Sequence, residues 1–133
     1  MSEIDGLTAV ASPYPVPDTV DRLAAAVEEA GLAVLARIDH AAAAAKVGLE
    51  LRPTTVLLFG RPEGGTPLMQ ERQTAGIDLP LKALAWQDEA GQVWLGWNEP
   101  TWIAARHGLP GSATAVEALT GALARFAAAA TRR

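Results

Sequence analysis

Apolar runs separated by glycine, proline and charged residues recur along the chain, and their lengths predict both strands and helices. Three runs, at residues 7–12, 32–38 and 54–59, have the length and the apolar or β-branched content of strands. The run at 32–38, "LAVLARI", is mostly apolar. It favours a central position in the sheet, because strands that are covered on both faces lack polar alternation.

Two helices are predicted between these strands. Asp18 is a favourable N-cap, and Gly31 is a favourable left-handed stop. Between them, apolar residues recur at helical spacing at Val20, Leu23, Ala24 and Val27. Asp39 is then expected to cap a short alanine-rich helix that ends at Gly48.

The second half of the chain predicts a hairpin and further short helices. A threonine-proline pair at residues 66–67 has the hydroxyl and the fixed φ that begin a helix. Segments 81–87 and 92–97 flank "DEAG", whose glycine suits a turn with positive φ, and they predict a β-hairpin. Thr101 is expected to cap another short helix, which Gly108 closes.

The last helix has the clearest pattern of all. Thr114 and Glu117 have the spacing of a capping box. Apolar residues then form one stripe, at Val116, Leu119, Leu123, Phe126 and Ala130. The stripe predicts packing against one face of the sheet, and a dimer seam is the alternative.

The predicted order is β-α-β-α-β-(α)-β-β-α-α. It defines an α+β fold, a single-domain sandwich in which helices pack on one main, mostly antiparallel sheet. One domain is expected to span residues 1–133, with residues 1–6 as a flexible tail, since neither an internal repeat nor a linker interrupts the pattern.

Composition narrows the classes of function. The 11 basic residues are scattered and are outnumbered by 15 acidic ones, which argues against a nucleic-acid partner. With no cysteine, disulfides, thiolate metal ligands and cysteine nucleophiles are excluded. No apolar run reaches the roughly 20 residues that cross a bilayer, and the first residues do not resemble an export signal. A cytoplasmic location without a membrane partner is therefore expected.

Three longer segments are similar to sequences of the DUF302 family: "ARIDHAAAAAKVGLELRPTTVLLFGRPEGGTPLM", "GIDLPLKALAW" and "NEPTWIAARHGL". The resemblance runs from about residue 7 into the final helix. It implies a compact α+β domain of bacteria and archaea that is frequently a homodimer, and it implies no settled activity. The positions that carry the resemblance are Asp39, His40, Gly60, Pro62, Gly65, Thr66, Pro67, Leu79, Pro80, His107 and Gly108. At Arg61 the chain departs from the asparagine that is usual in the family.

The segment "FGRPEGGTPLM" is the first candidate ligand site. A glycine-rich turn between a strand and a helix offers backbone N–H groups to an anion. Gly64, Gly65 and Thr66 would form that cradle, and Arg61 would add a positive charge. Gly60, at the end of the strand, is a further candidate ligand-binding residue. The segment lacks the lysine of a phosphate-binding loop, so a nucleotide is not favoured. The alternative, which its composition favours, is a turn with positive φ that leads into a capped helix.

His40 and His107, the two histidines of the chain, are candidate ligand-binding residues and candidate metal ligands. Neutral imidazole binds divalent metals and haem iron, so haem or a divalent metal is the cofactor hypothesis. No short metal motif supports it. As structural alternatives, His40 begins a helix and His107 favourably ends one. A third hypothesis is an enzyme in which His40 is the general base, supported by Asp39 or Asp78; a turn cap is the alternative role of Asp78.

Four tryptophans, at positions 86, 94, 97 and 102, are numerous for a chain of this length. Trp86 is expected in the core, while the group could also line a pocket or anchor a homodimer. The sequence thus predicts a small-ligand or cofactor-binding domain, whose pocket joins His40, the glycine-rich segment and His107. A homodimeric interaction module and a histidine-dependent enzyme are the alternatives.

Overall fold

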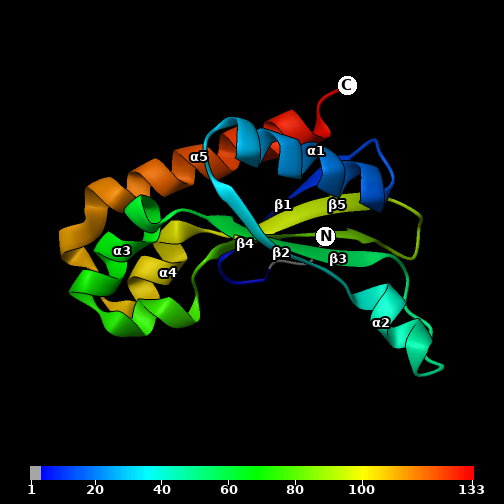
Figure 1. Ribbon diagram of the computed structural model, residues 1–133, viewed down its shortest axis with the longest axis horizontal. Helices are drawn as coiled ribbons and strands as arrows, with labels where there is room; N and C mark the ends of the chain where they lie inside the picture. Colours follow the sequence, from blue (N-terminus) through cyan, green and yellow to red (C-terminus); the bar gives the residue numbers. More distant parts are fainter. Residues whose placement is uncertain (1–3) are drawn as a thin grey trace.

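The computed structural model describes residues 4–133, and its elements follow the predicted order (Figure 1). The strands are β1 (Leu7–Ser12), β2 (Ala33–Asp39), β3 (Thr54–Gly60), β4 (Leu81–Gln87) and β5 (Val93–Asn98). The helices are α1 (Val16–Glu29), α2 (His40–Lys46), α3 (Pro62–Glu71), α4 (Pro100–His107) and α5 (Ala113–Thr131). Short 3₁₀ helices occupy Gln73–Ile77 and Pro110–Ser112. The predicted α+β class and the element order are confirmed.

The five strands form one antiparallel sheet in the order β1-β5-β4-β3-β2. Strand β2 therefore lies at an edge of the sheet, and its predicted central position is wrong. Its side chains are mostly exposed or half-buried, and Leu35 is 59% exposed.

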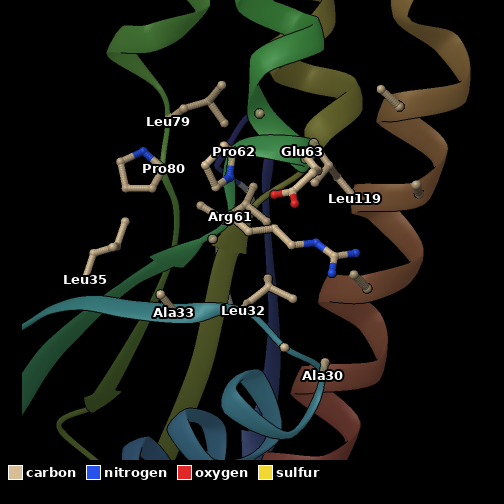
Figure 2. Close-up of a pocket in the computed structure, with 18 of the residues that line it drawn as sticks. Ala30, Leu32, Ala33, Leu35, Arg61, Pro62, Glu63, Leu79, Pro80 and Leu119 are labelled. Atoms are coloured by element: carbon tan, nitrogen blue, oxygen red, sulfur yellow. The ribbon is translucent and has the colours of Figure 1, made fainter.

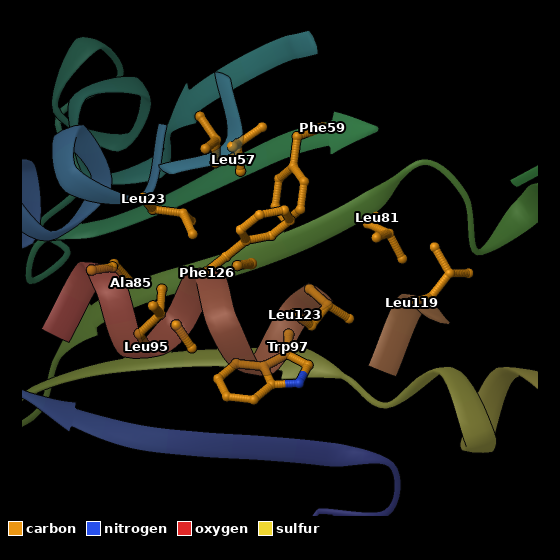
Figure 3. Close-up of a cluster of buried hydrophobic side chains, with 14 of the residues drawn as sticks. Leu23, Leu57, Phe59, Leu81, Ala85, Leu95, Trp97, Leu119, Leu123 and Phe126 are labelled. Carbon is orange, nitrogen blue, oxygen red and sulfur yellow. The ribbon is translucent and has the colours of Figure 1, made fainter. Parts of the chain in front are cut away.

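Helices α1 and α5 cover one face of the sheet (Figure 1). The predicted stripe of α5 is confirmed, because all five of its residues are buried. Phe126 packs edge-on against Phe59 of β3, with ring centroids 6.0 Å apart, and Figure 3 shows both rings between the helix and the sheet. Trp97, rather than Trp86, is the tryptophan of this core.

The other face of the sheet is apolar and only partly covered. Trp86 and Trp94 lie there as a directly opposed cross-strand pair, and the Trp86 ring lies over Gly96. Neighbouring positions are Val56, Leu58, Leu84 and Ile38. We call this surface, formed by these residues of β2 to β5, the open sheet face. Within the described strands its one charged side chain is that of Lys82.

Three helices begin at residues other than the predicted caps. Helix α1 begins at Val16 with Asp18 inside its first turn, and α4 begins at Pro100, one residue before Thr101. Helix α5 begins at Ala113 without a side-chain cap, so the predicted capping box does not form. Proline near the start explains α1 and α4, because its fixed φ already suits the helix. The Asp39 cap is confirmed, since its carboxylate accepts a hydrogen bond from the Ala42 N–H at 2.8 Å.

The predicted hairpin is confirmed, with Gly91 at a φ of 87°. The Asp88 carboxylate accepts hydrogen bonds from the N–H groups of Ala90 and Gln92 and from the Trp94 indole. The Trp94 hydrogen bond is the main reason why the pKa of Asp88 lies below its ordinary value.

Of the expected N-terminal tail, residues 1–3 lie outside the described residues. Residues 4–6 lie in a turn, and the Gly6 carbonyl accepts a hydrogen bond from the Glu99 N–H.

Candidate functional site

The glycine-rich segment after β3 is the beginning of a helix. Helix α3 starts at Pro62, directly after Arg61, so that Gly64, Gly65 and Thr66 all lie within it. Neither glycine has a positive φ. The predicted turn with positive φ and the predicted helix start at residues 66–67 are therefore wrong. Pro62 explains the difference, because it already provides the fixed φ of a first helical residue.

The two glycines instead allow close packing. A Cβ atom on Gly64 would lie 3.3 Å from Leu119 Cδ2 of α5. A Cβ atom on Gly65 would lie 3.4 Å from Cδ1 of Leu79, in the segment that leads into β4. Both distances are at the limit of ordinary contact, so the first turn of α3 lies directly against these two side chains.

A cavity of about 730 Å³ opens beside this turn (Figure 2). Its walls come from the start of β2, the junction of β3 and α3, residues 79–81 and the first two-thirds of α5. Most of the lining is apolar, and its larger apolar residues include Leu32, Leu35, Leu79, Pro80, Leu119 and Phe126. The apolar residues at the start of the edge strand β2 thus form one wall of a cavity. This explains why β2 is apolar although it does not lie in the centre of the sheet.

Three charged side chains border the cavity: Arg61, Glu63 and Arg125. Figure 2 shows the Arg61 side chain extending across the opening toward α5. Neither arginine forms an ion pair within residues 4–133, where the ion pairs are Arg37–Asp21 and the contacts of Asp78. The cavity therefore combines apolar walls with two guanidinium groups whose charge no carboxylate neutralises by direct contact.

The sequence-predicted ligand residues are only partly brought together. Gly60, Arg61, Gly64 and Gly65 line the cavity, whereas Thr66 is not among the lining residues. His40 is exposed and follows the end of β2 that pairs with Thr55, while Gly60 pairs with the opposite end. Thr55 and Gly60 are five residues apart along β3, which places the two ends roughly 17 Å apart. The pocket that was expected to join His40 to the glycine-rich segment does not form.

His107 belongs to a separate hydrogen-bonded cluster. Its Nε2 atom lies 2.6 Å from Asp78 Oδ2, and its Nδ1 atom lies 3.0 Å from the Thr74 hydroxyl. Arg106 donates hydrogen bonds to both oxygens of the same carboxylate at 3.0 Å. The side chains of His107 and Asp78 are only 7% and 11% exposed. Asp78 is thus the partner of His107 rather than a turn cap or a support for His40.

The two histidines lie at opposite ends of the sheet and cannot share one ion. Asp78 precedes β4, whose first residue Leu81 pairs with Phe59, whereas His40 lies at the other end of β3. Within residues 4–133, no group of three or more histidine and carboxylate side chains has the arrangement of a metal site. The Asp78–His107 cluster ties to α4 the segment that leads into Leu79 and Pro80 of the cavity wall.

Glu71 fixes the other end of α3. Its carboxylate accepts hydrogen bonds from the Ser112 hydroxyl at 2.6 Å and from the Gly111 N–H at 2.8 Å. The Ser112 hydrogen bond is the main reason why the pKa of Glu71 lies below its ordinary value. Because the pKa is lowered on folding, this contribution to stability is present above about pH 4.5 and is lost as the pH falls. Sequence spacing gave no sign of this contact, since 40 residues separate Glu71 from Gly111.

The fold and the site define a single-sheet α+β domain with an apolar cavity between its edge strand and two helices. The family model for the "Domain of unknown function DUF302" matches residues 8–126, and the chain belongs to this family. The crystal structure of an uncharacterized conserved DUF302 protein from Bacillus stearothermophilus has the same fold. Its TM-score is 0.85 at 20% identity, over 96% of this chain and 99% of that one.

Curated relatives carry the name of a transport protein. "Fluoride-specific ion channel FluC 1" of Brucella suis biovar 1 (strain 1330) is 45% identical over 127 residues, which are 92% of this chain and 50% of the relative. The protein of the same name from Brucella abortus biovar 1 (strain 9-941) is also 45% identical, over 47% of its length. The chain spans about half the length of these relatives. Among residues 4–133, no helix combines the length and the apolar content needed to cross a bilayer.

Replacing each histidine by alanine tests whether His107 stabilises the fold through its hydrogen bonds while His40 does not. We expect His107→Ala to lower the free energy of unfolding by about 1–3 kcal/mol, because Asp78 and Thr74 each lose a hydrogen-bond partner. His40→Ala is the matched control and should change it by less than about 0.5 kcal/mol, since His40 is exposed. Urea unfolding at pH 7 measures both. An equal loss of unfolding free energy in the two variants would contradict this structural role of His107.

Proposed function

We propose that this chain is a small-ligand-binding domain and that the cavity beside α3 is its site. The observation that carries the proposal is the cavity itself, whose volume of about 730 Å³ lies within the range of roughly 300–1,000 Å³ found for small-molecule sites. Support also comes from its construction, since an edge strand, a helix start and a long helix converge there. Binding sites commonly combine such apolar walls with a few polar groups.

The placement of the histidines does not favour the haem or metal hypothesis. No histidine lines the cavity, and His107 is already engaged with Asp78 and Thr74. A ligand in this cavity would be held by apolar packing and by the charged side chains at the opening. The side chains of the cavity therefore favour a ligand that is bound by its shape and charge over one that is held by histidine ligation.

Partial blocking of the cavity tests this proposal with an uncharged probe. Ala118 and Ala124 are both exposed on α5, and only Ala118 lines the cavity. We expect Nile red fluorescence to rise on binding to the wild type, and Ala118→Trp to weaken this binding by about tenfold because the indole occupies the site. Ala124→Trp should leave it unchanged. Absence of dye binding, or equal binding by both variants, would overturn the proposal.

The names of the curated relatives suggest a setting for the site. They are fluoride channels by name, and this chain corresponds to about half of each. We propose that the domain acts as a regulatory module, in which occupancy of the cavity alters fluoride transport. The test uses the Brucella suis protein in lipid vesicles, with fluoride efflux measured before and after addition of a ligand found for the isolated domain. Efflux that is unchanged at saturating ligand would contradict this setting.

A second candidate function is homodimerisation through the open sheet face, with a second copy of this chain as the partner. Trp86, Trp94 and Ile38 lie on this face, and Ile38 is 43% exposed. A surface with one charged side chain, Lys82, brings little electrostatic repulsion when it meets its own copy, which favours a self-complementary contact. The final helix, the other predicted interface, is less suitable because its apolar stripe is already used in the core.

Sedimentation velocity of two isoleucine variants tests the homodimer. We expect a wild-type dimer at micromolar concentration, and Ile38→Asp should weaken it by about tenfold or more because a charge is buried in an apolar contact. Ile77→Asp is the control, since Ile77 is 72% exposed and lies outside the sheet. A wild type that remains monomeric, or equal weakening by both variants, would remove this function.

A further inference from the structure

We infer that the cavity takes an anionic amphiphile, a molecule with an apolar body and one carboxylate or phosphate head. The inference rests on the proposed ligand-binding function and names the class of ligand. It follows from one juxtaposition, in which Arg61 and Arg125 border the opening of a cavity whose walls are mostly apolar.

The two arginines come from different elements and face the same opening. Arg61 directly precedes α3, and its Nη1 atom lies 3.8 Å from the place that a Cβ atom on Gly31 would occupy. Its guanidinium thus spans the gap between the α1–β2 connection and the start of α3. Arg125 lies on α5 beside Gly121, and both arginines are exposed. A head group bound in this cavity would therefore meet a lining that contains two positively charged donors.

The charges around the opening do not cancel. Glu63 is the one carboxylate among the lining residues, and it makes no ion pair with either arginine. Two guanidinium groups and one carboxylate leave an excess of positive charge at the opening. Guanidinium groups bind carboxylate and phosphate strongly, because their N–H groups match the spacing of two oxygens. An anion is thus favoured over a neutral or cationic head.

The walls indicate an apolar body rather than a flat polar ring system. Leu35, which is 59% exposed on the edge strand, would be covered by such a body, as would Leu79 and Pro80 on the opposite wall. Phe126 is the one aromatic residue of the lining, and it is buried between α5 and Phe59 of β3. The lining offers no exposed aromatic surface on which a nucleobase could stack. Aliphatic chains are therefore the best match.

Binding of matched ten-carbon compounds tests the class of ligand. Isothermal titration with decanoate, decyl phosphate, decanol and decylamine varies the head at constant chain length, and acetate provides a head without a chain. The charged compounds are kept below their micellar concentrations, and decanol is kept below its solubility limit. We expect decanoate or decyl phosphate to bind about tenfold more tightly than decanol, in keeping with charge-assisted hydrogen bonds at an exposed site. Decylamine and acetate should bind more weakly still. The two anionic compounds distinguish a carboxylate head from a phosphate head.

Arginine variants assign the preference to residues. The double variant Arg61→Gln/Arg125→Gln should bind decanoate no more tightly than decanol, with decanol binding unchanged. Arg52→Gln/Arg133→Gln removes the same charge elsewhere and should retain the preference for decanoate over decanol.

If decanol and decanoate bind the wild type equally, or decylamine binds most tightly, the inference fails and the cavity remains a ligand site. If the control variant loses the preference as well, overall charge is responsible and the inference also fails. If no compound with a chain binds, the proposed function itself fails.

Discussion

The packing of the α5 stripe against one face of the sheet is the interaction on which the rest of the structure depends. Leu123 and Phe126 lie over the sheet, and burial of such side chains contributes about 1.5–3 kcal/mol each. Helix α5 continues beyond the sheet toward α3 and α4 (Figure 1). There Leu119 lies against Gly64 in the first turn of α3. The cavity forms where α5 extends past the sheet.

Local patterns of the sequence were sufficient for most of the fold. The α5 stripe, the Asp39 cap and the hairpin around Asp88 each depend on residues that are close in sequence, and each is confirmed. The position of β2 could not be predicted in this way, because an apolar strand at the edge of a cavity has the same composition as a central strand. The start of α3 was misplaced for a similar reason, since two prolines, Pro62 and Pro67, both suit a helix start.

The candidate site was predictable only where it coincided with one short segment. Gly60, Arg61, Gly64 and Gly65 belong to one recognisable glycine-rich segment, and all four line the cavity. Gly64 and Gly65 lie there within a helix, where they allow close packing, and not in the predicted turn. Arg125 could not be found, because from the sequence it is one exposed residue beside a core stripe. The Asp78–His107 contact joins residues 29 apart and depends on tertiary folding. Neither of the two histidines, which residue type alone made candidates for metal or haem binding, lines the cavity.

The proposed ligand lies between β2, α3 and α5. A crystal structure of the protein grown with a medium-chain carboxylate tests this most directly. We expect density for an aliphatic chain against Leu35, Leu79 and Leu119, with the carboxylate about 2.7–2.9 Å from a guanidinium nitrogen of Arg61 or Arg125. Density on the open sheet face with an unoccupied cavity, or a carboxylate that points away from both arginines, would contradict it.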